Sequence, residues 1–172
     1  LAFNEGDIRI CGRSGCSDPV DCKRVVAYVP DNPDVYGFLT GSQYLNYVAD
    51  LFGVGVQERR ERIAHYAGRL GIDGRLGELV SAYSHGMRQK LVLVGAFLHA
   101  PRLLVLDEPF VGLDPEAAYE LRTMMREFVA RGGAIFLSSH VLDTVEKLCD
   151  EVAIIRRGRI VRVGPTEEVR GD

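Results

Sequence analysis

The sequence lacks the features that mark membrane-spanning, disulfide-stabilised and nucleic-acid-binding proteins. Its longest apolar run, residues 91–98, is far shorter than the roughly 20 residues that cross a bilayer as a helix. A formal net charge of −3 gives no electrostatic reason to expect nucleic acid as a partner. The cysteines form no C-x-x-C pair, so reduced thiols are favoured over a zinc site that includes Cys149; they are Cys11, Cys16, Cys22 and Cys149.

The 172 residues also contain no G-x-x-x-x-G-K-[ST] sequence. This glycine-rich loop holds nucleotide phosphates with its backbone amides and its lysine. The overall composition, 47% apolar and 26% charged, is that of an ordinary globular domain with a core. The composition therefore predicts one globular domain, and these 172 residues contain no phosphate-binding loop.

The most informative segment is 103–109, which reads L-L-V-L-D-E-P. Four consecutive apolar residues predict a strand buried on both faces, with Asp107 and Glu108 at its carboxyl end. Two adjacent buried acids are costly unless a metal or a reaction uses them. Ligands of open α/β sheets bind at the carboxyl ends of the strands. The alternative is a strand that ends in an ordinary acidic turn.

Strand and helix patterns alternate along the chain. Continuous or alternating apolar residues predict strands at 8–10, 25–29, 103–106, 134–137, 152–155 and 160–163. Helical periodicity and caps predict helices from Thr40 to Gly53, over 58–70, after Ser84, from Asp114 to Gly132 and over 141–149. This order predicts an α/β fold, a mostly parallel sheet with helical cover, into which residues 41–80 insert as a small helical subdomain.

Three further motifs accompany the acidic strand. Residues 83–87 read Y-S-H-G-M, residues 112–115 read G-L-D-P, and residues 137–140 read L-S-S-H at the end of another apolar run. In this order and spacing they resemble the signature motif, the D-loop and the switch histidine of the ATP-binding cassette (ABC) transporter nucleotide-binding domain, with 103–108 as its Walker B strand. The resemblance covers the whole chain, and it implies a P-loop NTPase-like fold.

The resemblance implies that residues 83–87 grip ATP held by a second nucleotide-binding subunit in a head-to-tail dimer. The candidate contacts to the γ-phosphate are Ser84, His85, Gly86 and Met87. The amides at the start of a helix are unpaired and favour phosphate, although a plain serine cap is the alternative. The family's common form is L-S-G-G-Q, so Tyr83, His85 and Met87 depart from it. Variants with histidine resemble those of exporters of drugs or ions.

The other motifs imply the chemistry of ATP hydrolysis. By resemblance, Asp107 holds Mg²⁺, Glu108 is the general base that polarises the attacking water, and His140 bridges the γ-phosphate and the catalytic carboxylate. Asp114 orders the active site of the facing subunit, although helix capping also explains it. Asp31 stands where the family usually has a glutamine that contacts Mg²⁺ and water. Its carboxylate can still reach a cation, but it adds negative charge near a triphosphate.

Residues 1–10 resemble the family's segment just after the P-loop and its helix. The resemblance therefore places the P-loop lysine about ten residues before Leu1. We accordingly expect residues 1–172 to be a partial ABC ATPase domain that is inactive by itself, while the complete protein is an ATPase.

The resemblance also implies a transmembrane permease subunit as partner and a cytoplasmic location, peripheral on the inner face of the cell membrane. Exposed candidates for that contact are Tyr36, Phe38, Leu39 and Tyr47, with local packing as the alternative. Two other functions remain open: a soluble ABC-type ATPase without a membrane partner, and a degenerate cassette that serves only as a dimerisation module. The transported substrate does not follow from the sequence.

Overall fold

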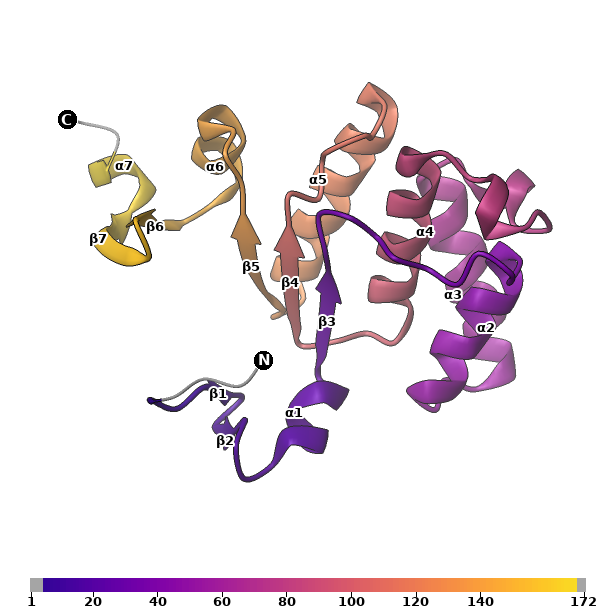
Figure 1. Cartoon of the computed structure of the whole chain (residues 1–172), viewed down its shortest axis with the longest axis horizontal. Coiled ribbons are helices and arrows are strands. Elements are labelled where there is room, and N and C mark those ends of the chain that lie inside the picture. The colour runs from indigo at the N-terminus through magenta and orange to yellow at the C-terminus, as the bar shows by residue number, and fades with distance from the viewer. Residues whose placement is uncertain (1–4, 170–172) are drawn as a thin grey trace. The chain divides into compact units, whose positions relative to one another are not determined.

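The computed structural model describes residues 5–169 (Figure 1). The chain divides into two compact units, with the boundary between Leu137 and Ser138. The first unit holds the sheet and the long helices, and the second holds a hairpin and two short helices. Within the described residues, no helix combines the length and the apolar character needed to cross a membrane.

The central sheet of the first unit has the strand order β3-β4-β5. Its strands are β3 (Val26–Val29), β4 (Leu103–Asp107) and β5 (Ala134–Ser138). Strands β3 and β4 are parallel, with Val26 opposite Leu103 and Val29 opposite Leu106, and all three arrows point the same way in Figure 1. The predicted α/β fold with a parallel sheet is therefore confirmed.

Two long helices follow from clear sequence signals. Helix α4 (His85–Leu98) is apolar almost all round, and most of it is buried, as we expected. Helix α5 (Pro115–Ala130) begins with proline at its first position and buries one face. The two helices contact each other through Phe97 of α4 and Phe128 of α5, whose rings pack edge to face with centroids 6.1 Å apart. The largest fully buried side chains of these helices and of β4 include Leu91, Leu93, Leu98, Leu104, Leu106, Leu121 and Met124.

Residues 41–80 contain mainly helical elements. They are α2 (Gly41–Leu51), α3 (Val56–Arg69), the 3₁₀ turn η1 (Asp73–Arg75) and the start of η2 (Val80–Ala82). The predicted capping box of α2 is present, because Gln43 N donates to Thr40 Oγ1 and Thr40 N donates to Gln43 Oε1. These helices lie in the same compact unit as the sheet. Their status as an inserted subdomain stays a prediction.

The amino-terminal part of the first unit contains a helix that we did not expect. Strands β1 (Arg9–Ile10) and β2 (Arg13–Ser14) form a short antiparallel pair. Helix α1 (Pro19–Arg24) follows, in a stretch rich in turn residues and cysteine. Proline at the first helical position, acidic Asp21 in the first turn and basic residues in the last turn were the available signals.

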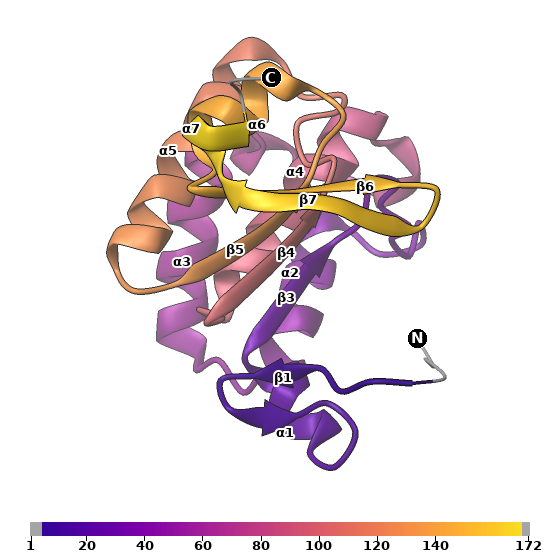
Figure 2. The ribbon, with the colours of Figure 1, turned by 90° about the vertical axis from the view of Figure 1, so that its left-hand side faces the viewer.

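The second unit is built around an antiparallel hairpin (Figure 2). Helix α6 (Leu142–Leu148) leads to β6 (Glu151–Arg156), which pairs with β7 (Arg159–Pro165), and α7 (Thr166–Val169) follows. Thr166 Oγ1 donates to the Cys149 carbonyl oxygen at 2.6 Å and joins the end of the hairpin to the end of α6. Strands β6 and β7 thus form a separate two-stranded sheet.

Our expectation that the strand at 103–106 is buried on both faces is wrong, and the neighbouring strands are also partly exposed. Leu104 and Leu106 of β4 are buried, but the neighbouring positions on that strand are only half-buried. Tyr28 of β3 is 59% exposed and Phe136 of β5 is 65% exposed. The long helices α2, α3, α4 and α5 lie on the far side of the sheet in Figure 2, so only one face of the sheet receives helical cover from them.

A charged contact joins α3 to α5. Arg69 Nε lies 2.9 Å from Glu120 Oε2, and Arg69 Nη1 lies 2.6 Å from Glu127 Oε2. The hydrogen bond from Arg69 holds the pKa of Glu127 below its ordinary value of 4.5. Two carboxylates on one guanidinium therefore fix the orientation of α3 on the core.

Replacing Arg69 by methionine is expected to lower the free energy of unfolding at neutral pH by up to about 1 kcal/mol, since the pair is partly exposed. A depressed carboxyl pKa stabilises the fold above the unfolded pKa, and this contribution disappears as pH falls through the folded pKa. The difference between wild type and Arg69→Met should therefore shrink below pH 4.5, as measured by urea unfolding at several pH values. Arg75→Met, whose ion pair with Glu78 is local, is the control.

Candidate functional site

The carboxyl end of β4 carries the two acids in different backbone conformations. Asp107 is the last residue of the strand, and Glu108 follows with a φ of 45°. A residue with a Cβ atom occupies this left-handed region at a cost of roughly 1–2 kcal/mol, so the surrounding structure must hold it there. The chain then turns, and Val111 N donates to the Glu108 carbonyl oxygen at 3.1 Å. Both acids are half-buried at this edge.

Asp31 lies at the same edge of the sheet. It comes two residues after β3, whose last residue, Val29, is opposite Leu106 in the parallel register. Asp31 therefore follows the carboxyl end of β3, as Glu108 follows the carboxyl end of the neighbouring strand β4. Carboxylate oxygens at this edge suit Mg²⁺, which takes one or two protein carboxylates and completes its shell with water and substrate phosphate. Among the described residues, no group of three or more His, Cys, Asp or Glu forms a metal cage.

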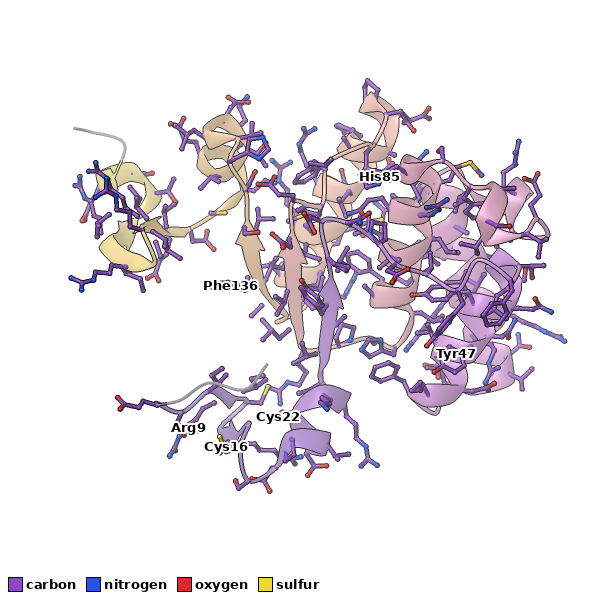
Figure 3. The ribbon with its side chains drawn as sticks, in the orientation of Figure 1. Arg9, Cys16, Cys22, Tyr47, His85 and Phe136 are labelled. Carbon is purple, nitrogen blue, oxygen red and sulfur yellow. The ribbon has the colours of Figure 1, made fainter. Side chains whose placement is uncertain are left out.

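The start of α4 is capped by Ser84. Its Oγ accepts a hydrogen bond from Met87 N at 3.2 Å, and Ser84 and His85 are exposed (His85 is labelled in Figure 3). The cap satisfies one of the amides of the first turn, and the helix dipole leaves this end attractive to an anion. The serine cap, which was the alternative to phosphate contact, is thus present, and the same geometry allows phosphate contact.

The loop after Glu108 lies against the start of α4. A Cβ atom on Gly86 would collide with the Gly112 carbonyl oxygen, and a Cβ on Gly112 would stand 2.6 Å from His85 Cδ2. Gly112 also has a φ of 77°, which glycine adopts without strain. Backbone therefore meets backbone here, and both positions need glycine.

Two polar side chains of α4 reach this loop. Gln89, fully buried, donates from Nε2 to the Pro109 carbonyl oxygen at 3.3 Å. Lys90 Nζ lies 2.5 Å from Asp114 Oδ2, and the same carboxylate accepts from Ala117 N at 2.9 Å as the cap of α5. The lysine ammonium is the main reason why the pKa of Asp114 lies below its ordinary value. Asp114 thus caps α5, as predicted, and also binds α4.

His140 belongs to the second unit. It lies between the end of β5 at Ser138 and the start of α6, beside a turn in which Val141 N donates to Ser139 Oγ at 3.2 Å. Its role as a switch histidine stays a prediction.

Within the first unit, the structure brings the 83–87 segment, the acidic edge and the 112–115 loop into one connected site. We did not expect Gln89 and Lys90 to take part in it. Gln89 had a usable signal, because a polar residue on a helix that is apolar almost all round needs a buried partner.

Comparisons with known proteins show the family to which the chain belongs. A family model described as "AAA domain, putative AbiEii toxin, Type IV TA system" matches residues 38–142, more than half of the chain. An uncharacterized ABC transporter ATP-binding protein of Synechocystis is 36% identical over 152 residues, 87% of this chain and 43% of that protein. The ABC-type transporter ATP-binding protein EcsA of Bacillus subtilis is 31% identical over 167 residues, 97% of this chain and 68% of that protein.

A solved structure titled as the ATP-binding subunit of an ABC transporter superposes with a TM-score of 0.92 at 36% identity, covering 96% of this chain and 69% of that one. A second, cbiO1 of Clostridium perfringens from the transporter complex cbiONQ, has a TM-score of 0.70 at 24% identity, covers 87% of this chain and 61% of that one, and shows the fold alone. The fold is that of a P-loop-type nucleoside triphosphatase. The chain belongs to the ATP-binding proteins of ABC transporters, and it spans about half the length of several curated relatives.

Gly86→Ala tests the close approach of α4 and the loop. The new methyl group would overlap the Gly112 carbonyl oxygen, so the backbone must shift, and the free energy of unfolding should fall by about 1–3 kcal/mol. Gly68→Ala is the control, because Gly68 lies within α3 and its Cβ would enter open space. It should leave stability unchanged or raise it by up to about 1 kcal/mol. Equal effects of both changes in denaturant unfolding would contradict the close contact.

Proposed function

We propose that this chain is the core of an ATP-hydrolysing subunit of an ABC transporter, of exporter type, that powers transport through a separate membrane subunit. One observation carries the proposal. The loop that follows Asp107 and Glu108 lies directly against the start of α4 at Gly86, so one subunit holds the acidic strand end and the exposed helix end in a fixed relation. The family membership supplies the nucleotide, ATP, to which such a site is matched.

In this proposal, each residue has a defined task. Glu108 accepts a proton from the water that attacks the γ-phosphorus, while the bond from that phosphorus to the bridging oxygen of ADP breaks. Asp107, with Asp31 near the same edge, would hold Mg²⁺, which neutralises charge on the phosphates. His140, in the second unit, would act as the switch histidine that contacts the γ-phosphate.

The start of α4 serves a second nucleotide-binding subunit. Ser84 and His85 are exposed, and Gly86 and Met87 are half-buried beside them. An exposed helix end of this kind suits the γ-phosphate of ATP that is held by the other subunit in a head-to-tail dimer. Asp114 is half-exposed close by and orders the facing active site.

Glu108→Gln in the complete protein is expected to lower the ATP turnover rate by roughly 10²–10⁴-fold and to leave ATP affinity nearly unchanged. The amide cannot accept the proton, but the phosphate contacts remain. Steady-state turnover and equilibrium nucleotide binding measure the two effects. Residues 1–172 alone, which contain no P-loop, are the negative control and should show no turnover. Near-normal turnover of Glu108→Gln would show that another group is the base.

A cluster of exposed aromatic side chains in the first unit supports the proposal of a membrane partner. Tyr36 lies 5.6 Å from Phe38 and 6.3 Å from Tyr47, measured between ring centroids. All three are largely exposed, and Phe38 is 76% exposed. A cluster of exposed rings marks a contact site for another protein. We propose that this surface receives a short cytoplasmic helix of the permease subunit and so places the chain at the inner face of the membrane.

Phe38→Ala is expected to weaken co-purification of the complete protein with its permease subunit, because the ring packs against no core in the free chain. The midpoint of thermal unfolding should change by only a few degrees. Tyr119→Ala, which removes an exposed ring from α5, is the matched control and should leave the complex intact. A large loss of stability with unchanged complex formation would show that Phe38 belongs to the core.

A further inference from the structure

We propose that Gln89 and Lys90 are positioning residues that fasten the loop 109–114 to α4, so that the phosphate-contacting end of α4 and the turn of Glu108 move as one body. The proposal rests on the proposed function. In that proposal, α4 would contact ATP held by the partner subunit, whereas Glu108 would act on ATP held by its own subunit. Gln89 and Lys90 would therefore couple the two ATP sites mechanically.

The loop is held at both ends and in the middle. At its start, Gln89 donates to the Pro109 carbonyl oxygen. At its end, Lys90 pairs with Asp114. Between them, Gly112 lies in van der Waals contact with the first turn of α4 at His85 and Gly86. Three contacts over six residues leave the loop little freedom to move independently of the helix.

The chemistry of Gln89 argues against a role in packing alone. Among the described residues, Gln89 is the polar residue that is buried, with 0% exposure. Its Oε1 has no hydrogen-bond partner within the described part of the protein. Such a group costs stability that an apolar residue of the same size would avoid. Its one bond, from Nε2, goes to the residue directly after Glu108. That bond stabilises the turn in which Glu108 adopts its left-handed conformation.

Lys90 is similarly restrained. Its side chain is only 13% exposed, although a lysine on a helix usually extends into water. Its ammonium group lies against Asp114, a carboxylate that already caps α5. The pair therefore joins α4 to the start of α5 across the loop, with the lysine side chain largely buried and the Asp114 side chain 51% exposed.

Lys90→Met in the complete protein is expected to raise amide hydrogen exchange in peptides covering 109–114 and to lower kcat by roughly 10- to 100-fold, because Glu108 loses its fixed position. The KM for ATP should change by less than about threefold, since Lys90 does not contact nucleotide. Lys90→Arg keeps the ion pair and should restore most of the rate. Gln89→Met removes the other tie and should act in the same direction.

Lys147→Met is the matched control, because it breaks a lysine–aspartate pair of α6, Lys147 with Asp143, in the other unit. It should leave loop exchange and kcat unchanged. Combining Lys90→Met with Asp114→Asn should cost no more than the larger single change if the two act as one pair. Thermal unfolding of every variant identifies losses that come from misfolding.

Normal loop exchange or normal kcat in both Lys90→Met and Gln89→Met would overturn the proposal. A matched rise in KM with unchanged kcat would also overturn it, because that pattern indicates direct nucleotide binding by these residues. A wild-type protein without ATP turnover would overturn the proposed function instead. In that case hydrogen exchange still decides whether Gln89 and Lys90 hold the loop, so the two failures are distinguishable.

Discussion

The arrangement of the candidate site depends on the close contact between the start of α4 and the loop that joins β4 to α5. At Gly86 and Gly112 there is no room for a Cβ atom, so the separation of the two backbones is fixed by van der Waals contact. This contact sets where the exposed end of α4 lies relative to Glu108. A side chain at either glycine would push the start of α4 away from the loop that follows Glu108.

A hydrogen bond and an ion pair fix the position of the loop along α4, in addition to the glycine contact. A glycine contact limits approach but does not prevent sliding, whereas the Gln89–Pro109 hydrogen bond and the Lys90–Asp114 pair fix the loop along the helix. Each tie has a cost, since Gln89 is fully buried and Lys90 nearly so. If Glu108 is the base that we propose, fixed geometry offsets this cost, because small displacements of a base lower rates steeply. Among the described residues, the fully buried polar side chain, Gln89, therefore lies beside the loop that follows the acids.

Local features of this fold could be predicted from the sequence because their causes are local. The Thr40–Gln43 capping box and the Asp114 cap need only residues three positions apart. The parallel sheet follows from alternating strand and helix patterns. The exposure of Tyr28 and Phe136 could not be predicted in this way, because an apolar run looks the same whether one face or both faces are covered. Whether a face of the sheet is buried depends on helices that are distant from the strand in the sequence.

The same distinction applies to the site. Motif order identified Asp107, Glu108 and the start of α4 as candidates, but it did not connect Lys90 with Asp114, which lie 24 residues apart. Nothing near Lys90 in the sequence distinguishes it from a solvated lysine; only the packing of the loop on α4 brings its ammonium to the carboxylate. A motif thus names the groups that contact substrate, whereas the groups that hold them emerge from tertiary packing. In this chain the supporting side chains, Gln89 and Lys90, lie on α4 itself, within one turn of the residues that would contact phosphate.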